Sequence, residues 1–216
     1  MTLRAVIFDM DFTLVDSSAA VIQCARAGFA RAGLPVPADE AIVRAIGLPL
    51  SDLVAEHAGE RAAEVVEGFL AEARRLTWVE TTTLMPHARE TLDALSRRGL
   101  ALGIATSKIG NSTAAILRHH KLQAFFGAVV SADDVSAPKP DPAPLLACAR
   151  LLDVAPSDAV YVGDHPYDII AARGACMRVI SVATGPTPRA ELAALNPDCL
   201  IGALDELPVA LDGDAS

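Results

Sequence analysis

The chain has 216 residues, of which 52% are hydrophobic, and a formal net charge of −9. This composition excludes a disordered chain, and the acidic balance argues against a groove that binds nucleic acid. The four cysteines are widely separated and form no CxxC pair, so we expect buried thiols in a reducing cytoplasm.

The first predicted element is a strand over residues 3–8. Its apolar run Ala5-Val6-Ile7-Phe8 has no helical spacing and suits a strand buried on both faces of a parallel sheet. The run is too short for a signal peptide or a membrane span, and we expect no membrane partner.

Asp9 and Asp11 follow this strand directly, at the end where open α/β sheets bind their ligands. Two carboxylates ~4 Å apart in an effective dielectric of ~20 repel each other by about 4 kcal/mol. A divalent cation would remove that cost. The pair therefore predicts a metal site, and one of its acids is a candidate nucleophile.

A helical segment interrupts the chain after this pair. Residues 18–32, 38–45, 50–57 and 61–78 are rich in helix-forming side chains, and glycine- and proline-containing turns separate them. We therefore predict an inserted helical cap domain over residues 16–83 and a core formed by residues 1–15 and 84–216.

The remainder of the chain alternates between strands and helices. Strands are predicted at residues 100–105, 126–130, 159–162, 178–182 and 198–201, and helices at 112–120, 142–152 and 166–173. This alternation predicts an α/β fold with a doubly wound, Rossmann-like parallel sheet.

Polar residues recur at the predicted carboxyl ends of these strands. Thr106 and Ser107 follow the second strand, Lys139 lies between two prolines, and Asp164 and Asp168 follow the fourth strand. Because the carboxyl ends of parallel strands share one edge of the sheet, we expect these residues to join Asp9 and Asp11.

The order DxDxT (9–13), Thr106, Lys139 and GDxxxD (163–168) resembles the haloacid dehalogenase superfamily of phosphatases over essentially the whole chain. The helical insertion resembles that superfamily's type 1 cap. The nearest branch is phosphoglycolate-phosphatase-like and pyrophosphatase-like. This resemblance implies a Mg²⁺-dependent phosphatase that acts on a small phosphorylated metabolite.

The resemblance also implies roles for the site residues. Asp9 would attack phosphorus, form an aspartyl-phosphate and contact the metal. Asp11 would be the general acid and then the general base, and its backbone carbonyl would bind the metal.

The same resemblance places the phosphoryl group and the metal. Thr106, which we favour over Ser107, and Lys139 would hold phosphoryl oxygens. Asp164 would ligate Mg²⁺, with Asp168 beside it or supporting it. An oxygen-only ligand set suits Mg²⁺ rather than zinc.

The cap is expected to select the substrate. The turn at Gly47 and Leu48 is a candidate for facing the leaving group, and Arg44 is a candidate partner for a carboxylate such as that of phosphoglycolate.

Phe12 departs from the family pattern, which has glycine at this position. A large side chain disfavours a positive φ here. We expect its ring to point away from the phosphate and toward the cap hinge. His165 lies inside the GDxxxD stretch and is expected at the surface or rim of the site.

Other functions share parts of this pattern. A dehalogenase needs neither Mg²⁺ nor Asp11, and a phosphonoacetaldehyde hydrolase needs a lysine that residues 16–83 lack. A β-phosphoglucomutase-type phosphoryl transfer and a pyrophosphatase remain open. A non-catalytic phosphate-binding module would predict a lost catalytic acid, and none is lost.

Overall fold

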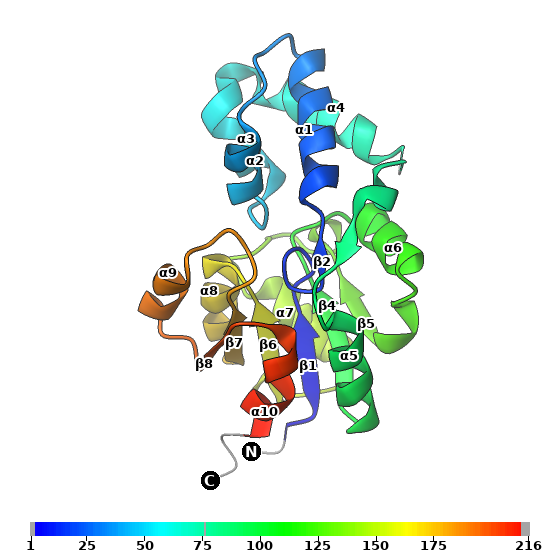
Figure 1. Cartoon of the computed structure of the whole chain (residues 1–216). Helices are drawn as coiled ribbons and strands as arrows, with labels where there is room; N and C mark the ends of the chain where they lie inside the picture. The colour runs from blue at the N-terminus through cyan, green and yellow to red at the C-terminus, as the bar shows by residue number, and fades with distance from the viewer. Residues whose placement is uncertain (1–2, 76, 213–216) are drawn as a thin grey trace.

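The computed structural model describes residues 3–75 and 77–212 (Figure 1). Six parallel strands form one sheet in the order β5-β4-β1-β6-β7-β8, which confirms the predicted doubly wound α/β fold. They are β1 Ala5–Phe8, β4 Ala101–Ala105, β5 Ala128–Val130, β6 Ala159–Gly163, β7 Arg178–Val182 and β8 Cys199–Ile201. The first strand lies in the middle of the sheet, so the acids that follow it are central.

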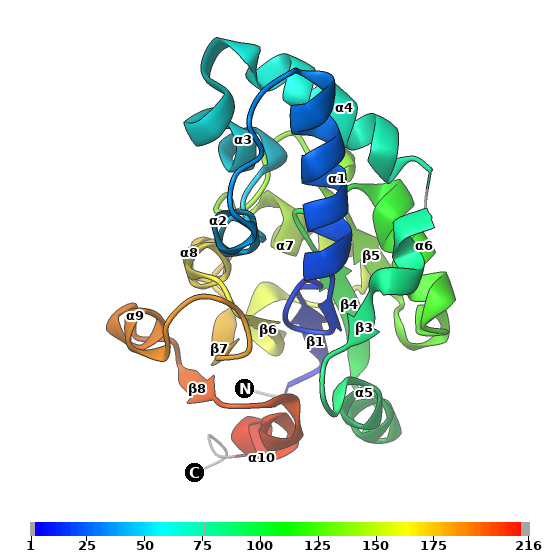
Figure 2. The same cartoon turned by 45° about the horizontal axis from the view of Figure 1, so that its top comes forward.

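Helices cover both faces of this sheet (Figure 2). They are α5 Ala88–Arg97, α6 Gly110–His119, α7 Ala143–Leu151, α8 Pro166–Gly174, α9 Arg189–Ala194 and α10 Leu207–Asp212. Val6 and Phe8 pack with α5, α6 and α10, whereas Ala5 and Ile7 pack with α7, α8 and α9. Successive strand residues point to opposite faces, so burial of both faces explains the uninterrupted apolar run of β1.

Three of these helices, α5, α9 and α10, are absent from the sequence prediction. Two of them, α9 and α10, have only six residues each. Segments this short carry little periodicity, and packing against the sheet stabilises them. None of the helices in the described part of the chain combines the length and apolar character needed to cross a bilayer.

Residues 16–83, which we call the cap, form a helical layer above the carboxyl ends of the strands (Figure 1). Its helices are α1 Ser18–Arg31, α2 Asp39–Arg44, α3 Leu50–Ala58 and α4 Ala62–Ala73. The helix expected to reach residue 78 ends at Ala73, and Thr77–Thr81 forms a short 3₁₀ helix instead. The indole of Trp78 donates a hydrogen bond to the Ala73 carbonyl (2.8 Å), which satisfies an acceptor at that helix end.

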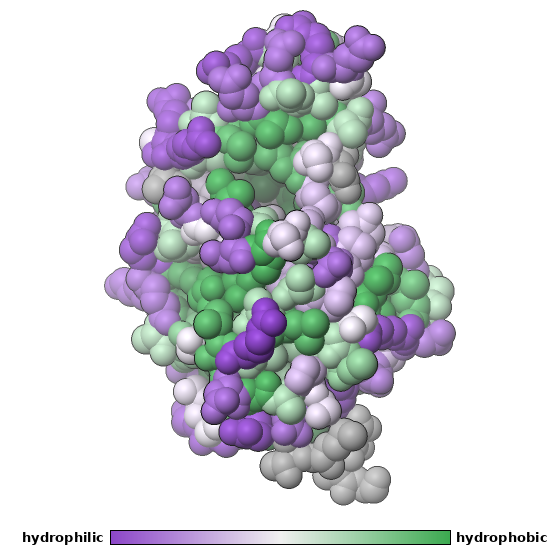
Figure 3. Space-filling model, turned by 180° about the vertical axis from the view of Figure 1, so that it is seen from behind, coloured by the Kyte–Doolittle hydropathy of each residue, from purple (hydrophilic) through white to green (hydrophobic). Residues whose placement is uncertain are grey.

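A two-stranded ribbon connects the cap to the sheet. β2 (Val15–Asp16) pairs antiparallel with β3 (Thr83–Leu84). The segment that enters the cap and the segment that leaves it therefore lie side by side, at the positions of the predicted domain boundaries. Seen from behind, hydrophilic residues cover the top of the cap and apolar residues gather below it (Figure 3).

Candidate active site

Three buried carboxylates meet above the carboxyl ends of β1 and β6. Oxygens of Asp9, Asp164 and Asp168 all lie within 4.8 Å of one another. Burial first, and then the charges of the neighbouring acids, raise the pKa of Asp9 to about 6 against the opposing effect of Lys139. Burial and the charges of Asp168 and Asp9 likewise raise the pKa of Asp164 well above its usual range. The cluster therefore holds more negative charge than its surroundings compensate.

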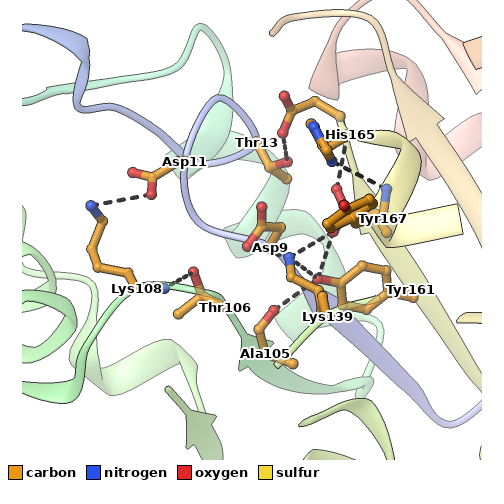
Figure 4. Close-up of polar contacts among 12 residues, drawn as sticks. Asp9, Asp11, Thr13, Ala105, Thr106, Lys108, Lys139, Tyr161, His165 and Tyr167 are labelled. Atoms are coloured by element: carbon orange, nitrogen blue, oxygen red, sulfur yellow. Dashed lines mark hydrogen bonds and ion pairs between the residues drawn. The ribbon is translucent and has the colours of Figure 1, made fainter. Parts of the chain in front are cut away.

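Lys139 is the cation inside this cluster, and only 1% of its side chain is exposed. Its Nζ lies 2.9 Å from Asp9 Oδ1 and donates to Asp168 Oδ1 at 2.6 Å (Figure 4). Burial lowers the pKa of Lys139, but the carboxylates of Asp168 and Asp9 together raise it by more. The side chain is therefore held as an ammonium group beside the predicted nucleophile.

Asp168 is fully engaged by protein donors. Its Oδ1 accepts from Lys139 and lies 3.2 Å from the Tyr161 hydroxyl, and its Oδ2 accepts from the His165 backbone N–H at 2.9 Å. The Tyr161 hydroxyl also accepts from Lys139 and lies 2.8 Å from the Ala105 carbonyl. Tyr161 was missed by sequence reasoning because it lies inside an apolar strand and gives no motif signal.

Asp164 is positioned by two residues whose contacts the sequence did not reveal. The hydroxyl of Thr13 donates to Asp164 Oδ1 at 3.1 Å. Gly185, from the loop after β7, lies so close that a Cβ on it would be 1.9 Å from Asp164 Oδ2. Only glycine at position 185 leaves room for the Asp164 carboxylate. Because Gly185 is far from the GDxxxD stretch in the sequence, no motif indicates this contact.

The cluster fits a hard divalent cation. Asp9 and Asp164 offer carboxylate oxygens, the ligand type that Mg²⁺ prefers. Asp9 Oδ1 is buried, and no described residue gives it a hydrogen bond of good geometry, although it faces the Lys139 charge. Asp168, whose oxygens are already engaged, is better suited to support the site than to bind the metal.

Asp11 points away from this cluster (Figure 4). Its Oδ1 accepts from the Ser17 hydroxyl, and its Oδ2 lies 3.1 Å from Lys108 Nζ. The Asp11 carboxyl therefore has its own partners, Ser17 and Lys108, outside the acid cluster. Metal binding through its backbone carbonyl stays a prediction.

Lys108 is a site residue that sequence reasoning missed. It comes two residues after Thr106, which is buried at the end of β4. The chain has just three lysines against fifteen arginines, and this scarcity was the signal that could have singled it out.

A cavity of about 90 Å³ lies between Asp11 and the cap. The predicted residues Ser107, Gly47 and Leu48 line it. Arg44 does not: it lines a separate hollow on the cap together with His57. The structure thus brings the turn at Gly47 and Leu48 to the site but not the predicted carboxylate partner.

Phe12 corrects one expectation. Its φ is 54°, a left-handed conformation that the sequence analysis disfavoured for a large residue. The ring packs into the apolar cluster of the cap with Val21, Phe29 and Ile46, so it does point toward the cap. Burial of the ring and the hydrogen bond from Thr184 Oγ1 to the Phe12 carbonyl (2.6 Å) offset the backbone cost.

His165 is more buried than expected, with 9% of its surface exposed. Its Nδ1 accepts from the Tyr167 backbone N–H at 3.1 Å and so caps α8. A Cβ on Gly47 would lie 3.3 Å from its Cγ, so the cap turn packs directly on the imidazole. Burial lowers the pKa of His165. The ring supports the cap turn instead of lying on the rim.

Comparisons with known proteins agree with this geometry. The family model described as haloacid dehalogenase-like hydrolase matches residues 6–182. Phosphoglycolate phosphatase of Escherichia coli (strain K12) is 31% identical over 97% of this chain and 92% of its own, and pyrophosphatase PpaX of Bacillus velezensis is 30% identical over 94% of each. A haloacid dehalogenase-like hydrolase structure from Bacteroides fragilis matches with a TM-score of 0.89 and 28% identity, over 95% of this chain and all of that one. The chain therefore belongs to the haloacid dehalogenase-like hydrolases, in their phosphoglycolate-phosphatase-like branch, and is a phosphatase of that family.

Proposed function

We propose that the protein is a Mg²⁺-dependent phosphatase that hydrolyses a small phosphomonoester through an aspartyl-phosphate on Asp9. The observation that carries this proposal is the placement of Asp9. Its carboxylate lies at the end of β1, within 4.8 Å of two further acids and 2.9 Å from Lys139. Such a carboxylate attacks phosphorus only when the negative charge of the phosphoryl group is screened.

In the first half of the reaction, an Asp9 oxygen bonds to phosphorus as the bond to the leaving oxygen breaks. Lys139 and Thr106 hold the phosphoryl oxygens, and Asp11 donates its proton to the leaving oxygen. Mg²⁺, held by Asp9, Asp164 and the Asp11 backbone carbonyl, would supply charge screening.

In the second half, Asp11 accepts a proton from a water molecule whose oxygen bonds to phosphorus. The bond between phosphorus and Asp9 breaks, and inorganic phosphate leaves. The position of Asp11 supports this division of roles, because its side chain lies outside the acid cluster and at the wall of the cavity.

The cavity beside Asp11 favours a short leaving group. Its volume of about 90 Å³ is well below the ~300–1,000 Å³ typical of pockets for larger ligands. Phosphoglycolate is our first candidate substrate, and relatives of that name support it. Pyrophosphate is the second, because a relative is named a pyrophosphatase. A sugar phosphate, which a mutase would need, has a larger leaving group than this cavity favours.

The location of the protein is part of the proposal. The described free cysteines, of which Cys24 and Cys148 are buried, agree with the cytoplasmic location expected from the sequence.

The test measures the inorganic phosphate released from phosphoglycolate with Mg²⁺ and after treatment with EDTA. We expect activity only with the metal, and an aspartyl-phosphate on residue 9 detectable by mass spectrometry after rapid acid quenching. Asp9→Asn keeps the shape of the side chain and removes the nucleophile, so it should fold and be inactive. An active Asp9→Asn variant, with folding verified by circular dichroism, would reject the assignment.

A further inference from the structure

Lys108 places a positive charge at the wall of the cavity next to Asp11. Its side chain is only 11% exposed, and its Nζ lies 3.1 Å from Asp11 Oδ2. The loop that carries it is fixed, because the Lys108 carbonyl accepts from Ala132 N (2.9 Å) and its N–H donates to Thr106 Oγ1 (3.3 Å). The backbone of Lys108 is therefore anchored beside Thr106, and its ammonium is held at Asp11.

The remaining wall of the cavity offers little polar contact. Among the described residues that line it, Asp11 and Lys108 are the only charged ones. The cap side is apolar and includes Val21, Ile46 and Leu48. A largely buried ammonium in such surroundings requires an anionic partner, and Asp11 is its partner when no ligand is bound.

A second polar atom at this wall lacks a partner. Ser107 Oγ is buried, and no described residue gives it a hydrogen bond. Ser107 and Lys108 line the same cavity, and the buried hydroxyl reaches a ligand beside the ammonium by rotation about the Cα–Cβ bond of Ser107. A carboxylate oxygen accepts from both donor types.

We propose that Lys108, assisted by Ser107, binds a carboxylate on the leaving group and so selects short phosphomonoesters with a second anionic end. This inference rests on the proposed phosphatase function and adds the residue that recognises the leaving group. Asp11 is the partner of Lys108 in this structure. A bound carboxylate takes over as partner and leaves Asp11 facing the leaving oxygen.

Size and charge together favour a carboxylate. The cavity admits only a short group, and a carboxylate is smaller than a second phosphoryl group. Arg44, the carboxylate partner predicted from sequence, lines the other hollow with Glu40 and Glu56 and does not line this cavity. Lys108 replaces it as the specificity residue.

The experiment compares kcat/KM for phosphoglycolate with kcat/KM for 2-hydroxyethyl phosphate, which has a neutral hydroxyl in place of the carboxylate. We expect the wild-type enzyme to prefer phosphoglycolate and Lys108→Met to lower that preference by about tenfold to a hundredfold, the range of a hydrogen bond to a charged group. Lys108→Arg should restore part of it, mainly through KM. Lys121→Met, the same change at an exposed lysine, should leave the ratio unaltered.

Each outcome separates this inference from the proposed function. A Lys108→Met ratio equal to the wild-type ratio overturns the role of Lys108 while the phosphatase assignment stands. A wild-type enzyme that hydrolyses neither ester and does not hydrolyse pyrophosphate overturns both. Pyrophosphate is the third substrate. If Lys108→Met lowers kcat/KM for pyrophosphate alone, Lys108 recognises a phosphoryl group instead of a carboxylate. Lys108→Gln serves in place of Lys108→Met if the latter does not fold, as judged by thermal unfolding.

Discussion

The Lys139 ammonium donates to Asp168 Oδ1 at 2.6 Å, inside a region from which solvent is almost fully excluded. The same ammonium faces Asp9 at 2.9 Å. A buried pair of this kind contributes little net stability by itself, but loss of one partner leaves an uncompensated charge. Lys139 is therefore a structural residue as well as the phosphate contact that we propose.

Lys139→Met should lower the free energy of unfolding by about 3–5 kcal/mol, because Asp9 and Asp168 would remain buried without their cation. Urea denaturation of the metal-free protein measures this effect. Adding Asp168→Asn to the variant removes one of the two unpaired carboxylate charges and should restore part of the free energy of unfolding. Lys139→Met with wild-type stability would contradict the pairing described here.

Gly47→Ala should weaken substrate binding more than it weakens the fold. The new Cβ would lie 3.3 Å from the His165 ring and would displace the cap turn away from the core. Because this turn lines the cavity, KM should rise severalfold. Gly33→Ala is the matched control. Gly33 is also a cap glycine with positive φ, but a Cβ there meets nothing within 4 Å. It should cost about 1 kcal/mol of stability through backbone strain and leave KM unchanged. Equal KM values for the two variants would argue against the Gly47–His165 contact.

The Phe12→Gly variant should be more stable than the Phe12→Ala variant, which is the reverse of the usual order for these two residues. Both Phe12→Ala and Phe12→Gly lose the ring from the cap cluster, and truncation of a buried Phe typically costs about 3–5 kcal/mol. Only glycine also relieves the left-handed backbone at φ 54°, by about 1 kcal/mol. Thermal unfolding ranks the two variants, and Mg²⁺ binding should persist in both. Greater stability of the alanine variant would show that residue 12 is not strained.

Alkylation should distinguish the cysteines of the native protein. Cys24 and Cys148 are buried, and burial raises the pKa of each thiol to about 12, so neither forms a thiolate near neutral pH. Cys176 is exposed and should react with iodoacetamide first. Peptide mass spectrometry at pH 8 measures the order, with urea-unfolded protein as the control in which all four react. Early labelling of Cys148, which lies on α7, would contradict the packing of its thiol against β4.

The sequence by itself determined the sheet, the helical insertion and the residues that follow each strand. Buried parallel strands are uninterrupted apolar runs, and their polar neighbours in sequence must gather at one edge, so Asp9, Lys139 and Asp164 could be placed together in advance. Local sequence could not determine contacts made by residues without a motif of their own.

Tertiary structure alone decided those contacts. Tyr161 was hidden in an apolar strand, and Gly185 is a lone glycine whose importance comes from the carboxylate packed against it. Arg44 and Lys108 show the same limit, because the direction in which cap and core side chains face depends on how the two layers pack. Phe12 adopts a positive φ against its intrinsic preference, since the cap provides an apolar cluster that buries its ring. The sequence pattern determines which residues lie at the carboxyl edge of the sheet, and long-range packing determines which of them are in contact.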